Sequence, residues 1–223
     1  MSALRRSFLV STCIILAAST SGAVGAAPKT AQGSAPHDQA AQRNQGAPQG
    51  QAAQRGKTSK AAERRRRLDN LFAALKLVDD ESAADHIVNR IWMTWFQSGN
   101  RKVNDMVSLA VIYTNEQEFA AALKVLNKVV ARAPKYAEGW NRRATLYFLM
   151  GDYDRSLVDI KKTLALEPRH FGALAGRGLI YNARGQYKKA LAAFEQALKL
   201  NPFLTEQRRI IPLLRQKLGI QKI

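Results

Sequence analysis

Apolar residues recur at helical spacing along most of the chain from residue 68 onward. The segment 187–200 is a clear example, because its apolar residues fall at intervals of one, three and four positions and so mark one face of an amphipathic helix. That face consists of Ala190, Leu191, Phe194, Ala197, Leu198 and Leu200. Similar stripes occur in residues 68–99 and 103–166, so this part of the chain is predicted to be all-α.

The same pattern occurs twice in succession, in residues 137–168 and 171–202. A shift of 34 residues places Tyr147 on Tyr181, Gly151 on Gly185 and Pro168 on Pro202, and a further shift upstream reaches Pro134. Glycine fits the turn between two helices, where a positive φ is needed, and proline stops a helix because it has no N–H to donate. The period therefore predicts three successive pairs of helices.

This 34-residue period resembles the tetratricopeptide repeat (TPR), a helix–turn–helix unit. The family favours large, small and aromatic residues at repeat positions 4, 8 and 11, small residues at 20 and 27, a large one at 24 and proline at 32. The resemblance implies an all-α, right-handed superhelical solenoid of stacked units at 103–136, 137–170 and 171–204. The residues that match are Met106, Ala110, Tyr113, Ala122, Leu126, Val129 and Pro134, then Trp140, Ala144, Tyr147, Ser156, Ile160, Thr163 and Pro168, then Leu174, Gly178, Tyr181, Ala190, Phe194, Ala197 and Pro202.

Residues 1–26 are predicted to be an export signal. Arg5 and Arg6 precede an apolar run from Phe8 to Ala18, which is too short to span a bilayer, and small residues follow up to Ala26. A retained membrane anchor is the alternative, and the twin arginines leave the choice between the general secretory and twin-arginine routes open. The signal predicts a location in the periplasm of a Gram-negative bacterium. Its removal would take away Cys13, the only cysteine, and with it any disulfide or thiol chemistry.

Residues 27–60 are rich in Ala, Gln, Gly and Pro and are predicted to be disordered, as either a tether or a simple spacer. The arginine run that follows is interpreted either as a docking patch for an anionic partner or as the solvated first turns of a helix. Positive charge is unfavourable at a helix N-terminus, so neither interpretation is preferred. The basic patch consists of Arg64, Arg65, Arg66 and Arg67.

Residues 61–102 hold two more amphipathic helices, but they lack the repeat punctuation and are predicted to form a degenerate capping unit. Counting back from the first repeat puts Phe72 at position 4 and Trp92 at position 24. Trp92 and Trp95 are predicted core residues, with an exposed aromatic anchor as the alternative.

Residues 205–223 are predicted to form a C-terminal capping helix that Pro212 breaks or kinks.

The resemblance implies a concave groove lined by the first helix of each repeat, with a basic rim, which suits an extended or helical peptide. The family's clamp for a C-terminal carboxylate needs Lys and Asn where this chain has Val107 and Val111, so that activity is not predicted. Arg143 and Arg177 share repeat position 7 and are interpreted as surface or intramolecular ion-pairing residues, or else as anion ligands. The predicted groove and rim residues are Asn104, Val107, Val111, Glu138, Asn141, Thr145, Phe148, Ala175, Leu179, Asn182, Arg169 and His170.

Motifs for catalysis, metal binding or cofactor binding are not found. The three histidines have no metal-ligand partners at helical spacing, and the chain contains neither a Gly-rich phosphate loop nor a G-x-S-x-G elbow. No cofactor, no metal and no enzymatic activity are therefore predicted.

The formal charge is +18, with nine basic and two acidic residues in 27–67 and 24 basic and 15 acidic residues from 68 on. An acidic partner is therefore possible. A second hypothesis is a polyanion-binding protein that uses its Arg-rich N-terminal segment on acidic lipid, wall polymer or nucleic acid. Nucleic acid is disfavoured by the export signal. Membrane contact is compatible with the charge, but no span is expected after signal removal.

The runs WNRRATLYFLMG and LALEPRHFGAL resemble a group of exported TPR proteins from alpha-proteobacteria without assigned biochemistry. The favoured hypothesis is therefore an exported, non-catalytic scaffold that binds a protein or peptide in the cell envelope. The sequence does not indicate the oligomeric state.

Overall fold

The computed structural model describes residues 49–220, with side chains from residue 60 onward, and every regular element in this range is an α-helix. The predicted signal at 1–26, residues 27–48 and residues 221–223 lie outside the described range. The helices are α2 (Gln49–Leu75), α3 (Glu81–Phe96), α4 (Arg101–Asn115), α5 (Phe119–Arg132), α6 (Ala137–Leu149), α7 (Tyr153–Leu166), α8 (Phe171–Ala183), α9 (Tyr187–Leu200) and α10 (Thr205–Lys217).

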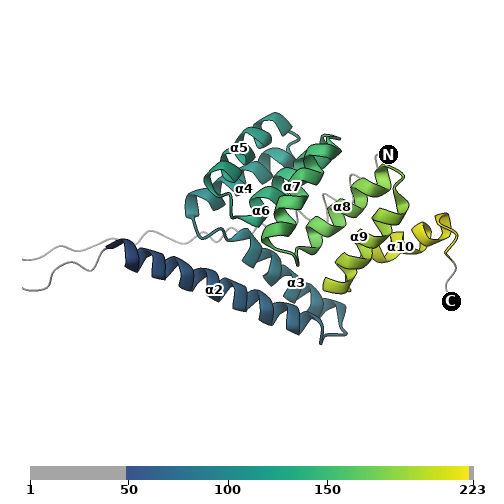
Figure 1. The fold of residues 1–223 in the computed structure, drawn as a ribbon, viewed down its shortest axis with the longest axis horizontal. Helices are drawn as coiled ribbons and strands as arrows, with labels where there is room; N and C mark the ends of the chain where they lie inside the picture. The colour runs from purple at the N-terminus through teal and green to yellow at the C-terminus, as the bar shows by residue number, and fades with distance from the viewer. Residues whose placement is uncertain (1–48, 221–223) are drawn as a thin grey trace, which may run out of the picture.

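Three helix pairs, α4–α5, α6–α7 and α8–α9, stack side by side and form the body of the molecule (Figure 1). The starts of α6 and α8 are separated by the same 34 residues as the starts of α7 and α9. Each of the three repeat prolines follows the end of the second helix of a pair. The predicted all-α solenoid of helix–turn–helix units is confirmed.

The turns within the three pairs share a left-handed residue. Gly151 and Gly185 have φ values of 80° and 69°, as the turn requires, and Gln117 adopts the same conformation in the first pair with φ 63°. Glycine reaches this region at no steric cost, whereas Gln117 must tolerate contact between its Cβ and the backbone.

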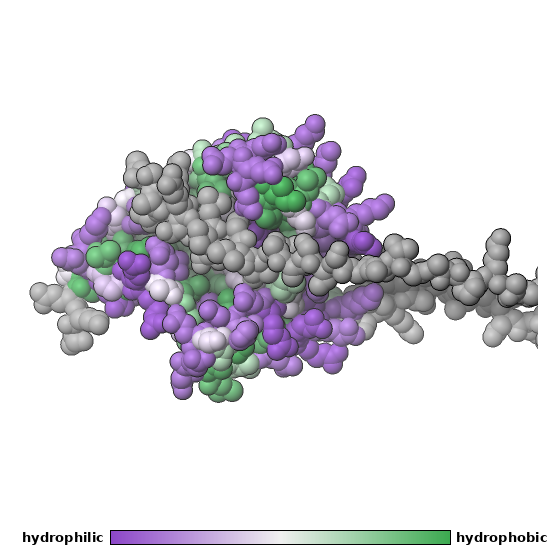
Figure 2. All heavy atoms as spheres, turned by 180° about the vertical axis from the view of Figure 1, so that it is seen from behind, coloured by the Kyte–Doolittle hydropathy of each residue, from purple (hydrophilic) through white to green (hydrophobic). Residues whose placement is uncertain are grey.

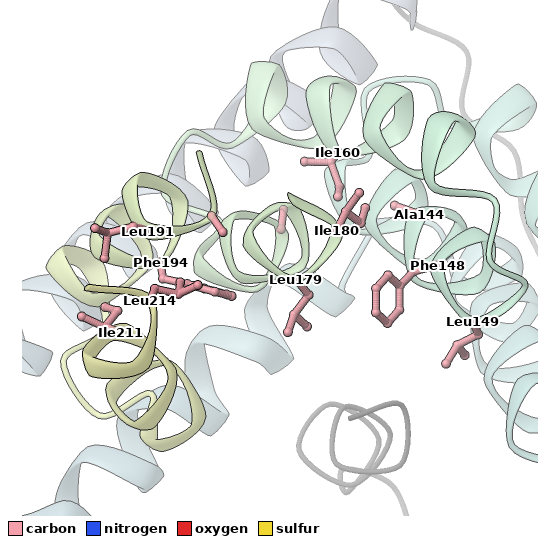
Figure 3. Packing of buried hydrophobic residues seen from close by; sticks show 12 residues of the cluster. Ala144, Phe148, Leu149, Ile160, Leu179, Ile180, Leu191, Phe194, Ile211 and Leu214 are labelled. Atoms are coloured by element: carbon pink, nitrogen blue, oxygen red, sulfur yellow. The ribbon is translucent and has the colours of Figure 1, made fainter. Parts of the chain in front are cut away.

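The contact between the two helices of each repeat pairs a small residue with a large one of matching size. Gly178 in α8 faces Phe194 in α9, and a Cβ built on Gly178 would lie 2.4 Å from the Phe194 ring. The equivalent residues are Ala144 with Ile160 in the second repeat, which share a core cluster (Figure 3), and Ala110 with Leu126 in the first. The larger aromatic ring thus occurs only where the facing residue has no side chain.

Helix α2 begins earlier than the sequence predicts. Residues 49–60 belong to the segment predicted to be disordered, yet they form the first turns of this helix, which protrudes from the body (Figure 1). Ala, Gln, Arg and Lys are good helix formers, and the packed C-terminal half of α2 provides the nucleus from which the helix extends.

The pair α2–α3 does not occupy the place of a capping repeat. Its apolar face packs against α8 and α9, in a cluster that joins Leu71, Leu75 and Ile91 to Phe171 and Leu174. A capping unit would instead pack on α4. The predicted capping position is wrong because counting back along the 34-residue period assigns repeat positions to these residues. It does not determine which helices their apolar face packs against.

Pro212 lies inside α10, which continues to Lys217, so the proline does not break this helix. Pro212 and Arg208, whose carbonyl loses its partner, are both exposed, so water can satisfy that carbonyl. The buried Ile211 and Leu214 hold α10 against the last repeat.

We predict that Gly178→Ala destabilises the fold by about 1–3 kcal/mol, although alanine normally improves a helix interior, because the new methyl group overlaps the Phe194 ring. Urea denaturation measures the change. The second substitution Phe194→Ile should recover stability in the Gly178→Ala background, because it restores the pairing of the second repeat. Equal costs of Phe194→Ile in both backgrounds would contradict this size matching.

Candidate interaction surface

The predicted groove side of the third repeat is covered by the chain itself. Helices α2 and α3 lie along this side of the stack, with α3 between α2 and the repeats (Figure 1). Leu68, Phe72 and Leu75 of α2 and Ile91 of α3 are buried in the shared cluster, together with Ala175 of α8. The α2–α3 hairpin is therefore an intramolecular ligand of the repeat stack.

Aromatic rings form the centre of this contact. The Trp95 indole stacks on the His170 imidazole, with ring centroids 4.1 Å apart and an interplanar angle of 11°. Trp92 meets Phe171 edge to face at 5.4 Å, and Phe72 meets the same ring at 6.3 Å. Such pairs contribute about 0.5–1.5 kcal/mol each beyond area burial, so the cluster fixes the hairpin on α8. Trp95 is 5% exposed, which confirms the predicted core role.

Gly172 allows this close approach. A Cβ on Gly172 would lie 2.5 Å from the Trp92 ring. Glycine at this position therefore gives the indole direct access to the α8 backbone, and any side chain would push α3 away.

A buried polar group lies directly beneath the aromatic cluster. The Ala173 N–H donates to His170 Nδ1 at 3.1 Å, so the ring proton is on Nε2, which lies 3.0 Å from Glu138 Oε2. Asn141 and Arg142 also donate to the Glu138 carboxylate, at 3.0 and 2.5 Å. This network links the start of α8 to α6 and satisfies a carboxylate that is only 1% exposed.

Burial raises the pKa of the Glu138 carboxyl, but the Arg142 guanidinium and the hydrogen bond with His170 outweigh it, so the net pKa lies below the usual value. Burial and the Glu138 charge also raise the pKa of the Tyr136 phenol, which stays protonated and donates to the Phe96 carbonyl at 2.6 Å. That bond ties the end of α3 to the stack.

Two outer contacts involve α2: one attaches it to the repeat stack, and the other joins it to the end of α3 within the hairpin. Arg169 pairs with Asp69 of α2 at 2.6 Å while its guanidinium lies over the Phe72 ring. Arg64 donates to the Gln97 carbonyl at 3.0 Å. Arg64 is thus half-buried, whereas Arg65, Arg66 and Arg67 are exposed on α2, so only three members of the predicted basic patch face solvent.

The structure divides the predicted groove residues into two sets. Seven are buried and do not line an open groove in this structure: Val107, Glu138, Asn141, Phe148, His170, Ala175 and Leu179. Five are half-buried: Asn104, Val111, Thr145, Arg169 and Asn182. Phe148 and Leu179 project from the same side of neighbouring helices (Figure 3). The hairpin contributes to the burial of Ala175 and His170, whereas Phe148 and Leu179 belong to the core cluster of the repeats and α10.

Arg143 makes a two-pronged ion pair with Asp159, with N–O distances of 2.7 and 2.9 Å, and a further bond to Asn127 at 2.8 Å. The intramolecular interpretation of this residue is confirmed. Arg177 donates to Gln196 at 2.8 Å on the surface.

Sequence reasoning missed the roles of Tyr136, Phe171 and Gly172 in holding the hairpin. A usable signal was present: residues 68–99 carry more aromatic residues than a polar end cap needs, and Phe171 lies next to His170 at a helix start.

Among the described residues, no group of His, Cys, Asp and Glu is arranged to hold a metal ion. Likewise, none of the helices from α2 to α10 has the length and hydrophobicity to cross a bilayer.

The fold and this surface define a helical-repeat protein of the solenoid class. Family models of the tetratricopeptide repeat match residues 172–204 and 108–160. These two segments therefore match the tetratricopeptide repeat. A TPR repeat-containing protein of Rhizobium etli is 43% identical over 96 residues, which are 43% of this chain and 47% of that protein. The match thus spans about half of that relative.

Solved structures support the same fold. The TPR domain of Sgt2 from Aspergillus fumigatus matches 54% of this chain and 81% of its own length, with a TM-score of 0.50 and 17% identity. The first TPR of Spaghetti (RPAP3), bound to an HSP90 peptide, matches 53% of this chain and 94% of its own, with a TM-score of 0.51 and 20% identity. MamA matches 71% of this chain and 85% of its own, with a TM-score of 0.50 and 18% identity.

We predict that Trp95→Ala lowers the free energy of unfolding by about 3–5 kcal/mol, because it removes the ring that covers His170 and Phe171. Met93→Ala in the same helix is the matched control, since Met93 is 40% exposed and should change stability little. Hydrogen exchange should accelerate first in α2 and α3. A uniform acceleration across all repeats would contradict a separable hairpin.

We further predict a pH-dependent cost of Glu138→Gln. The lowered pKa means that the Glu138 carboxylate contributes stability above its unfolded pKa of about 4.5 and loses it as pH falls through the folded value. The variant should be about 1.5–3 kcal/mol less stable at pH 7, and the difference should shrink below pH ~4.5. Urea midpoints between pH 3 and pH 7 measure this, and a constant difference would contradict the assignment.

Proposed function

We propose that this chain is an exported, non-catalytic TPR scaffold that binds a protein or peptide partner in the periplasm of a Gram-negative bacterium. TPR solenoids generally act as protein-binding scaffolds, and the described residues suggest no alternative chemistry. Export rests on the signal predicted at residues 1–26. The TPR relative in Rhizobium etli is compatible with a bacterial source, but its own partners do not transfer to this chain.

One observation carries the binding function: the repeat stack already holds an amphipathic helical hairpin. Phe72, Trp92 and Trp95 enter the surface of α8 as the anchors of a bound helix would. The first TPR of RPAP3 is solved with an HSP90 peptide bound, so a domain of this fold can bind a peptide. The stack in this protein is therefore a surface that accepts apolar helices.

The partner-binding part is assigned to the first and second repeats. Val111 and Thr145 hold the same position in α4 and α6, which are neighbours in the stack, and both are half-buried rather than covered. Val107 is fully buried in this structure, so a carboxylate clamp cannot be built there. An apolar or mildly polar segment of the partner fits this part better than an acidic C-terminus.

The exposed arginines of α2 support the second candidate, binding of an anionic polymer. Arg65, Arg66 and Arg67 face solvent on a helix that protrudes from the body. Such binding depends on release of counterions, so it should weaken strongly between roughly 0.05 and 0.2 M salt. Contacts with the groove should tolerate the same change.

We predict that a photo-crosslinking residue at Val111 or Thr145 yields one discrete protein adduct in the periplasmic fraction. Val158 is the control position, because it is 59% exposed on α7, the second helix of its pair. The adduct should persist at 0.2 M salt. Adducts only from positions 65 and 66, lost at that salt, would instead establish the polyanion hypothesis, and recovery of the protein in the cytosol alone would contradict export.

A further inference from the structure

The first repeat leaves uncovered a face that the later repeats bury. Ile112 in α4 holds the position of Leu146 in α6 and Ile180 in α8, at successive shifts of 34 residues. Leu146 and Ile180 are both 0% exposed, because each packs against the preceding helix pair, whereas Ile112 is 50% exposed. Among residues 49–220, no helix covers this side of α4, since the α2–α3 hairpin lies on α8 and α9 instead.

The neighbouring positions show the same contrast. Leu109 is 40% exposed, whereas its counterpart Arg143 reaches Asn127 of the preceding pair at 2.8 Å. Asp105 is exposed, whereas its counterpart Ala173 is 1% exposed. The stacking stripe of α4 therefore consists of five exposed residues at intervals of three and four: Lys102, Asp105, Leu109, Ile112 and Glu116.

This face is not the polar surface that usually ends a repeat array. Figure 2 shows hydrophobic side chains gathered on the lobe formed by α4 and α5 when the molecule is seen from behind. Leu109 and Ile112 are adjacent on the helix, one turn apart, so they form a single apolar spot. Stacking of a further helix on α4 would bury both.

We propose that this face of α4 is a homodimer interface, in which α4 of a second copy of the chain packs antiparallel across a two-fold axis near Leu109. The charges along the stripe favour this occupant, because Arg101 and Lys102 lie at one end and Glu116 at the other. An antiparallel pair brings each basic end beside Glu116 of the partner subunit. Asp105 stays one turn from Arg101 on its own helix.

A two-fold contact uses one patch twice, which requires self-complementary positions. In this pairing Leu109 meets Leu109 and Lys102 meets Glu116, whereas Asp105 faces Ile112. The two leucines meet at the axis, and the ion pairs at both ends fix the antiparallel orientation. A single helix pair buries less than the roughly 1,200–2,000 Å² of a stable interface, so the dimer is weak and forms at micromolar or higher concentrations.

Sedimentation equilibrium of the full chain over a wide concentration range tests the proposal. Leu109→Asp should raise the dimer dissociation constant at least about tenfold, because it places two carboxylates at the axis. Val158→Asp is the matched control, an exposed apolar residue on α7 that should leave the constant unchanged. Circular dichroism should show that both variants keep the fold.

A charge exchange distinguishes this contact from general stickiness. Lys102→Glu and Glu116→Lys should each weaken the dimer, and the two together should restore it, because the pair across the axis is re-formed with reversed signs. A wild-type chain that stays monomeric throughout would overturn the proposal. So would a dimer unaffected by Leu109→Asp, or a double variant no better than the single ones.

Discussion

The stacking of Trp95 on His170 is the contact on which the arrangement of this molecule depends. It joins a hairpin near the start of the described chain to the last repeat, and it lies directly above the buried network around Glu138. His170 serves both sides, because Nδ1 caps α8, Nε2 binds Glu138 and the ring face receives the indole. Loss of this contact would release the hairpin and expose the apolar face of α8.

The stacking of Trp95 on His170 also leaves one polar group without a hydrogen bond. The Trp95 indole N–H is buried without a hydrogen-bond partner among the described residues, which leaves a desolvated donor. The centre of the hairpin contact is therefore held by ring packing and area burial, and the polar contacts made by Tyr136 and Arg169 lie around it. This explains why Gly172 matters, since even one methyl group there would separate Trp92 from the α8 backbone.

Because the hairpin covers part of the third repeat, the accessible surfaces lie elsewhere on the molecule. A TPR stack of three units normally offers a continuous concave side, but here the hairpin covers its C-terminal part. Within the described part of the chain, the surfaces open to other molecules include the half-buried region of the first two repeats, the exposed arginines of α2 and the uncovered face of α4. The proposed partner site and the proposed dimer interface both include α4 but use different residues of it.

The repeat period predicted the helix pairs, their turns and the small-to-large contacts, because these depend on residues within one unit or its neighbour. Gly151 and Phe194 illustrate such local signals. The position of α2–α3 could not be predicted in the same way. An amphipathic stripe shows that Phe72 and Trp95 will be buried, but it does not specify which of several apolar surfaces they meet.

The same limit of the sequence pattern explains why some predicted groove residues are buried. Glu138 and His170 were predicted to line and rim the groove from their repeat positions, yet their burial depends on a hairpin about 40–100 residues earlier in the chain. Arg143 was predictable as an ion-pairing residue, because its partner Asp159 lies in the next helix of the same repeat.

The most direct test of this account is a cross-link between α2 and the start of α8. Asp69 and Arg169 pair at 2.6 Å and are both partly exposed, so cysteines at these two positions, with Cys13 replaced by Ser, can be joined by a short bismaleimide. The account predicts efficient cross-linking within a single chain in dilute solution, and its loss when Trp95 is also changed to Ala. Failure to cross-link in the folded protein would show that the hairpin does not lie on the third repeat.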